Sequence, residues 1–195
     1  MLSVSRARLP LTALCLFAAS CGVDNAAQSP FALWGMRPGQ PLNQVAQFLI
    51  RQDHRSWERC TPIAGGYRRC VHFTGWVVGD LIVIADSGDK VVYIRFSPSD
   101  YGSGRDLMFD YDLSGMERRW MRVKGVTANP NGVSDQNPRG TAYFTTPRGR
   151  YKAFVTFDGH LCTGKPIPCP AHVILADLRA GNLAAVDSGA PRLPL

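Results

Sequence analysis

The fold is decided by two apolar runs on either side of a short polar turn: LIVIA (81–85), DSGDK (86–90) and VVYIRF (91–96). The turn contains Asp, Ser and Gly, which favour chain reversal, so the stretch predicts an antiparallel β-hairpin. Residues 81–84 are apolar on both faces of a strand, which predicts a central strand. In 91–96 the apolar residues alternate with Tyr93 and Arg95, which predicts a strand nearer the sheet edge.

Upstream of the hairpin, the sequence predicts a helix over residues 41–52 and a strand over residues 67–73. Pro41 suits the first turn of a helix, where its missing N–H is not needed. The apolar residues of this segment fall on one helical face: Leu42, Val45, Phe48 and Leu49. That spacing predicts a helix packed on a core.

Downstream, a second helix is marked at both ends. Ser114 and Glu117 have the spacing of a capping box, and Gly125 stands where a glycine commonly ends a helix. Residues 127–140 are rich in Asn, Pro and Gly and predict a loop. Three further strands are expected, over residues 141–145, 151–158 and 172–178.

Together these elements predict an α+β fold with helices packed on an antiparallel β-sheet. The order helix, three strands, helix, three strands also raises the alternative of two tandem helix-plus-three-strand modules. We expect five parts in the chain: a signal peptide (1–20), a tether (21–30), a helix-plus-sheet module (31–97), a second α+β half (98–187) and a tail (188–195).

The N-terminus has the pattern of an export signal. Arg6 and Arg8 precede an apolar stretch over residues 9–19, which leads through small residues into Cys21. The stretch is too short for a comfortable membrane span, so cleavage is the better interpretation. The segment FAASC (17–21) also resembles a bacterial lipobox, in which the cysteine is lipidated and becomes the first mature residue. Plain secretion with cleavage after Ser20 is the alternative.

Charge and composition narrow the classes of partner. The chain has 195 residues, 22 basic and 15 acidic, for a net charge of +7. Cleavage of the signal removes two arginines, which leaves 20 minus 15, or +5. Export makes nucleic acid an unsuitable partner for this basic surface. A cell-envelope protein, an anionic envelope polymer or anionic lipid fits better, with the membrane reached through the lipid anchor.

Four cysteines remain once Cys15 has left with the signal and Cys21 has been lipidated: Cys60, Cys70, Cys162 and Cys169. They allow three pairings. We favour the local pairs Cys60–Cys70 and Cys162–Cys169, because each pair lies in one turn-rich segment. Histidines near these thiols, at positions 72, 160 and 172, leave metal binding as an alternative. No paired C-x-x-C spacing supports it, and an oxidising compartment favours disulfides.

Enzyme signatures are weak. Gly159 to Lys165 imitates a phosphate-binding loop, but Pro166 stands where the loop needs Ser or Thr. No G-x-S-x-G nucleophile elbow occurs in the sequence. Asp110 and Asp112, with a nearby histidine, leave a periplasmic hydrolase as the alternative function. The sequence predicts no catalytic residue, cofactor or metal ligand.

The second helix carries a basic face beside its apolar stripe. Met116, Trp120 and Val123 form the stripe, which predicts core packing. The basic residues are Arg118, Arg119, Arg122 and Lys124. A solvated surface or a contact with an anion would both explain that face.

The first half resembles a module of bacterial exported proteins. The features are Trp34-Gly35-Met36, then Gly39, then a helix, then Cys60 and Cys70, and lastly Gly79 with a hairpin. Over residues 31–96 this pattern is similar to that of the outer-membrane assembly lipoprotein BamE (SmpA/OmlA) and of the beta-lactamase inhibitory protein. The resemblance implies a non-catalytic binding or scaffolding role. We therefore expect an exported, lipid-anchored envelope protein, an outer-membrane or cell-surface lipoprotein, and we favour the position that faces the periplasm.

Overall fold

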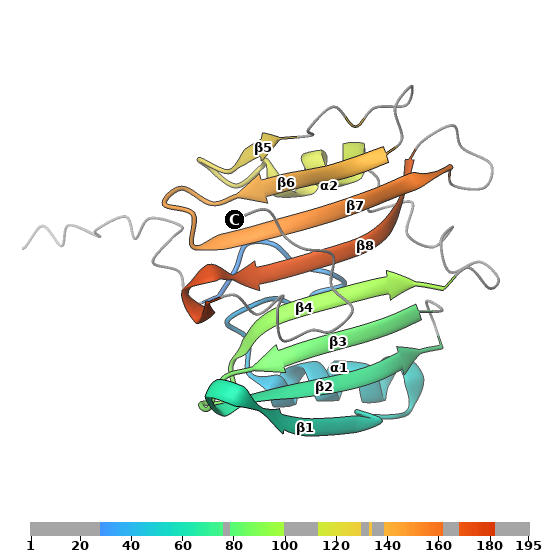
Figure 1. Ribbon diagram of the computed structural model, residues 1–195, viewed down its shortest axis with the longest axis vertical. Helices are drawn as coiled ribbons and strands as arrows, with labels where there is room; N and C mark the ends of the chain where they lie inside the picture. Colours follow the sequence, from blue (N-terminus) through green and yellow to red (C-terminus); the bar gives the residue numbers. More distant parts are fainter. Residues whose placement is uncertain are drawn as a thin grey trace, which may run out of the picture.

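A computed structural model describes residues 28–75, 79–99, 113–129, 133, 139–161 and 168–181. These residues form one eight-stranded antiparallel sheet with the strand order β1-β2-β3-β4-β8-β7-β6-β5 (Figure 1). The strands are β1 (Arg59–Ile63), β2 (Tyr67–Thr74), β3 (Gly79–Ala85), β4 (Val91–Pro98), β5 (Thr127–Asn129), β6 (Arg139–Thr145), β7 (Tyr151–Leu161) and β8 (Pro168–Asp177).

Two α-helices lie on the same face of this sheet. In Figure 1, α1 (Leu42–Asp53) lies behind β2 and β3, and α2 (Leu113–Trp120) lies behind β6. Two short 3-10 turns, Ala64–Gly66 and Leu178–Ala180, follow β1 and β8. The α+β prediction is confirmed in this coarse form, but the sheet is a larger part of the fold than expected.

Two of the strands were not predicted. Residues 127–140 were expected to be a loop, yet Thr127–Asn129 forms β5 and residues 139 and 140 begin β6. β1 contains Pro62, which argues against a strand, but β1 lies at the edge of the sheet, where a missing N–H is tolerated. Both strands are short and are held by pairing with one neighbour, β2 for β1 and β6 for β5.

β4 lies at the middle of the sheet, so the prediction of a near-edge strand was wrong. It pairs with β3 on one side and with β8 on the other. Tyr93 and Arg95, which suggested a polar face, are both buried, at 0% and 8% exposure. Tyr93 packs in a second apolar cluster, on the face of the sheet away from the helices. The strand sequence alone does not reveal that this second face is also buried.

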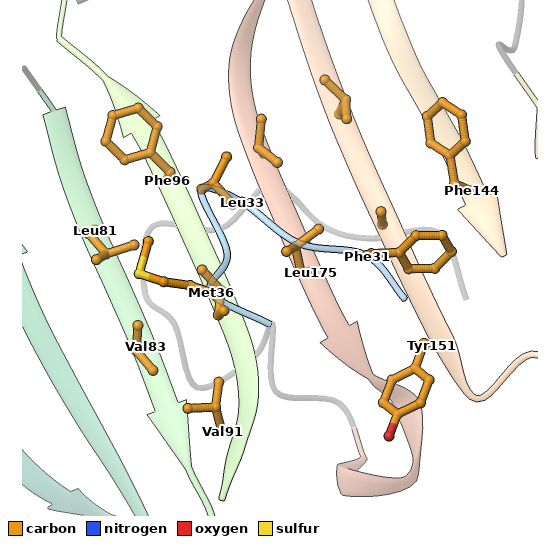
Figure 2. Packing of buried hydrophobic residues seen from close by; sticks show 14 of the residues in the cluster. Phe31, Leu33, Met36, Leu81, Val83, Val91, Phe96, Phe144, Tyr151 and Leu175 are labelled. Carbon is orange, nitrogen blue, oxygen red and sulfur yellow. The ribbon is translucent and has the colours of Figure 1, made fainter. Parts of the chain in front are cut away.

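The helix-bearing face carries the larger hydrophobic core. α1 contributes Leu42, Val45 and Leu49, and α2 contributes Met116 and Trp120. Between the helices, an N-terminal segment packs Phe31, Leu33 and Met36 onto the sheet. Figure 2 shows Phe31 toward Phe144, Leu33 near Phe96 and Leu175, and Met36 near Leu81 and Val83.

The opposite face holds a smaller apolar cluster. Its buried members are Ile84, Val92, Tyr93, Phe154, Ile174 and Ala176. Tyr67 and Ala180 border the cluster, and the Tyr67 hydroxyl donates a hydrogen bond of 3.1 Å to the Ala180 carbonyl. This bond joins β2 to the turn after β8, across the strands between them.

Candidate functional site

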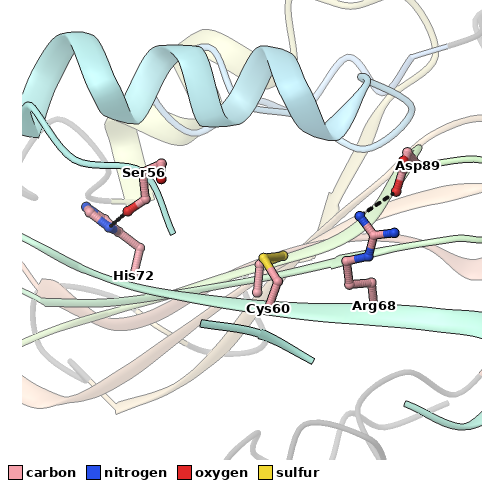
Figure 3. Close-up of a disulfide and its surroundings, with 6 residues drawn as sticks. Ser56, Cys60, Arg68, His72 and Asp89 are labelled. Atoms are coloured by element: carbon pink, nitrogen blue, oxygen red, sulfur yellow. Dashed lines mark hydrogen bonds and ion pairs between the residues drawn. A yellow bond between two sulfur atoms is a disulfide. The ribbon is translucent and has the colours of Figure 1, made fainter. Parts of the chain in front are cut away.

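Cys60 and Cys70 form a disulfide, the local pair favoured from sequence. They are direct cross-strand partners on β1 and β2, with their Cα atoms 4.1 Å apart, and the bridge lies beneath α1 (Figure 3). The bridge fastens the edge strand to the sheet. Cys21, Cys162 and the side chain of Cys169 lie outside the described residues, as do Asp110 and Asp112.

The basic residues of the second helical segment are all exposed: Arg118, Arg119, Arg122 and Lys124. Met116 and Trp120 point into the core, as the apolar stripe predicted. α2 is shorter than expected and ends at Trp120, so Arg122 and Lys124 follow it in a turn. Gly125 has a φ of 80°, which accounts for glycine at the end of this segment.

The histidines have separate environments. His72 is buried and contacts Asp53 and the carbonyl of Ser56, a structural arrangement that fastens α1 to β2. His54 is exposed and ends α1 in a left-handed conformation, with a φ of 57°. His172 lies on the face of the sheet away from the helices. The side chain of His160 lies outside the described residues.

A polar pair crosses the centre of the sheet. Oγ of Ser97, on β4, lies 2.8 Å from Nδ1 of His172, on β8. Both residues are half-buried, and Asp80 of β3 stands in register with Ser97. A serine hydrogen-bonded to a histidine is the first requirement of a nucleophilic hydrolase. Asp80, however, adjoins the serine, whereas a triad acid holds the far nitrogen of the histidine.

A second site is built on a tight turn at Trp34 and Gly35. Leu33 and Met36 exchange backbone hydrogen bonds of 2.9 Å, so the two residues between them reverse the chain. Both have positive φ angles, 50° for Trp34 and 89° for Gly35. A bulky residue in this conformation costs about 1–3 kcal/mol, and such costs concentrate at functional sites.

The turn forms one wall of a groove of about 530 Å³, and α1 forms the other. Trp34 is half-buried, and its ring meets Phe96 edge to face with centroids 4.9 Å apart. Phe48 of α1 is also half-buried and lines the groove. The polar lining comes from Gln40, Asn43, Gln44, Gln47 and Arg51. We call this the Trp34 groove.

A second groove, of about 410 Å³, lies beside the disulfide. Its lining includes Trp57, Cys60, Arg68 and Asp89. Arg68 and Asp89 form an ion pair of 3.1 Å, visible in Figure 3, although both side chains are about half exposed to solvent. Exposed pairs of this kind add little stability. Arg68 and Asp89 offset each other's charge, and Lys90 also lines this groove.

Comparison with known protein families, curated proteins and solved structures finds no match to this chain. Within the described ranges, no group of His, Cys, Asp and Glu residues could hold a metal ion. None of the helices in that part of the chain is long and apolar enough to cross a membrane.

Sequence reasoning missed both the Trp34 groove and the Ser97–His172 pair. The dipeptide Trp34-Gly35 was a signal, because glycine after an aromatic residue permits a tight turn that presents the ring. The polar side chains of the groove were not recognised as a set, although residues 44, 47 and 51 of α1 follow helical spacing. Ser97 and His172 gave no signal, since only strand pairing brings them together.

Proposed function

We propose that this chain is an exported bacterial envelope protein, tethered by lipid on Cys21, with a non-catalytic binding role. The observation that carries the proposal is the Trp34 groove, whose lining combines the aromatic residue of a strained turn with several neutral amides. Amide side chains donate and accept hydrogen bonds but do not take or give protons at neutral pH. Such a lining suits recognition rather than acid–base chemistry.

The tether is supported by the N-terminal sequence. Residues 1–20 have the charged, apolar and small-residue order of an export signal, and Cys21 follows a lipobox-like run. The disulfide Cys60–Cys70 agrees with an oxidising compartment. Cytosolic reductants do not reach secreted or envelope proteins, so a disulfide persists there.

The partner is expected in the envelope. The exposed cations Arg118, Arg119, Arg122 and Lys124 favour an anionic polymer or an acidic protein surface over nucleic acid. The resemblance of residues 31–96 to BamE-like lipoproteins and the beta-lactamase inhibitory protein supports the same role, because both act by binding. The groove and the basic surface lie on different elements, so they can serve different contacts.

Metabolic labelling with a fatty acid tests the tether. We expect label on the native protein and none on Cys21→Ala, while Cys15→Ala, whose cysteine lies inside the signal, keeps the label.

Crosslinking in the native envelope, followed by purification, tests the binding role. Undiminished label on Cys21→Ala would remove the anchor, and an envelope that yields no crosslinked protein or polymer would remove the binding role.

The Ser97–His172 pair favours a second function, a periplasmic hydrolase. The 2.8 Å contact would let the imidazole take a proton from the hydroxyl as it attacks an acyl group. A fluorophosphonate probe tests this, because it labels activated serines covalently. Labelling that is lost in Ser97→Ala and kept in Ser87→Ala, a serine in an exposed turn, would favour the hydrolase over the binding role.

We also infer that the two halves of the fold are modules. In each half a helix precedes a meander of four antiparallel strands, and the last strands, β4 and β8, pair with each other. The expected order had three strands in each half. Native-state hydrogen exchange tests the inference, because two modules would open as two cooperative units rather than one.

A further inference from the structure

We propose that the Trp34 groove binds a glycan with a carboxylate or other anionic substituent at the Arg51 end. The inference deepens the proposed binding role and rests on it. It starts from the shape and chemistry of the lining, in which the described residues offer aromatic rings, neutral amides and one cation. A ligand that matches this set has apolar faces, many hydroxyl groups and negative charge.

The aromatic wall supplies the apolar contact. The backbone of Trp34 has a φ of 50°, and only a few per cent of non-glycine residues have a positive φ. Holding the indole in this turn therefore costs conformational free energy. Phe96 meets the ring edge to face and restricts its rotation. A ring that is fixed before binding loses little entropy when a sugar face packs against it.

The amide row supplies the polar contacts. Asn43, Gln44 and Gln47 are exposed on α1 along the groove. Gln40 is already oriented, because its Oε1 accepts a hydrogen bond of 3.1 Å from the Arg37 backbone N–H. Each amide presents both a donor and an acceptor, which matches sugar hydroxyl and acetamido groups.

Arg51 sets the charge preference. It stands one turn after Gln47 on α1, so it extends the amide row toward the end of the helix. It is the only charged side chain among the described residues that line the groove. A guanidinium binds a carboxylate through two parallel hydrogen bonds, which favours an anionic sugar unit there.

An extended peptide is the competing occupant, and the lining favours it less. Peptides dock on sheet edges, in apolar helix grooves, in aromatic polyproline grooves or on arginine clusters. The helix wall of the Trp34 groove consists mostly of amides, with a single arginine and the half-buried Phe48, so it is neither an apolar helix groove nor an arginine cluster. A proline-rich peptide is nonetheless the probe that would expose this alternative.

The test is calorimetric titration of the purified mature protein in detergent with three probes. These are a neutral N-acetylglucosamine trimer, a hexuronic acid trimer and a proline-rich peptide. We expect both glycans to bind with dissociation constants of order 0.1 mM, the acidic one about fivefold tighter. Trp34→Ala should weaken both at least about tenfold, whereas Trp34→Phe should retain part of the affinity.

Two matched variants isolate the groove. Arg51→Gln should remove the preference for the acidic trimer and leave the neutral one unchanged. Trp57→Ala, at the second groove, should leave both glycans unchanged. The proposal is overturned if neither glycan binds at about 10 mM, if Trp34→Ala binds as the native protein does, or if the peptide binds more tightly. Capture of an envelope protein by crosslinking would then leave the binding role standing without the glycan.

Discussion

The Nε2 atom of His72 lies 2.7 Å from Oδ2 of Asp53, and both side chains are buried. Nδ1 of the same ring lies 2.9 Å from the Ser56 carbonyl oxygen, an acceptor only, so Nδ1 carries a hydrogen. Asp53 also accepts the backbone N–H of Gly75 at 3.1 Å. One carboxylate therefore joins the end of α1 to β2 and to the residue after it, which holds one wall of the Trp34 groove.

Removal of that carboxylate is expected to destabilise the fold. Asp53→Ala leaves a buried imidazole nitrogen and a backbone N–H without their acceptor, a loss of about 2–4 kcal/mol in the free energy of unfolding. Urea denaturation measures it. Asp89→Asn is the control, because Asp89 is exposed and its φ of 55° is one that asparagine tolerates. The control should change by less than about 0.5 kcal/mol, and equal losses in both variants would contradict the prediction.

The disulfide is expected to contribute stability by restricting the unfolded chain. Cys60 and Cys70 are separated by ten positions in sequence, and a loop of that size corresponds to about 2–3 kcal/mol in the loop-closure model. The double variant Cys60→Ser/Cys70→Ser should unfold at a lower urea concentration than the oxidised protein. Reductant should lower the midpoint of the native protein further than that of the variant, in which only the expected Cys162–Cys169 bridge is left to open. Matching midpoints for the native and double-variant proteins would count against the prediction.

The turn that presents Trp34 is expected to depend on glycine. A Cβ on Gly35 would meet no atom within 4 Å, but the φ of 89° is strained for any L side chain. Gly35→Ala should lower the free energy of unfolding by about 1 kcal/mol. Gly88→Ala, in the β3–β4 turn, is the control, because the described glycines with a positive φ do not include Gly88. Thermal unfolding compares the two, and an equal effect would show that backbone conformation is not the cause.

Alkaline pH is expected to weaken the fold partly through Tyr151. Burial of the side chain is the main cause that raises its pKa, because tyrosinate is poorly solvated there. The native state thus holds the proton more tightly than the unfolded state, so this contribution is present below the ordinary tyrosine pKa and is lost as pH rises through the folded value. Tyr151→Phe should lose less stability between about pH 8 and pH 11 than the native protein. Parallel losses in urea denaturation across that range would rule this out.

Helix α1 and the long strands could be predicted because their signals are local. The apolar residues of α1 repeat at helical spacing, and the structure places the helix at Leu42–Asp53, one residue from the expected 41–52. β3, β4 and β7 also begin or end within a few residues of the predicted bounds. β1 and β5 had no such pattern, since Pro62 and Asn129 disfavour strands and only a neighbouring strand stabilises them.

The amino-acid sequence by itself predicted the Cys60–Cys70 pair and the identity of most helices and strands, because each depends on residues close together in the chain. The order of the strands was decided by tertiary structure. Tyr93 pairs with Ala176, and that contact placed β4 in the centre of the sheet. The Trp34 groove has the same origin, since its aromatic turn and its amide row become one site only when both pack on the sheet. Contacts between residues far apart in the sequence stabilise these features, and a local sequence pattern does not show such contacts.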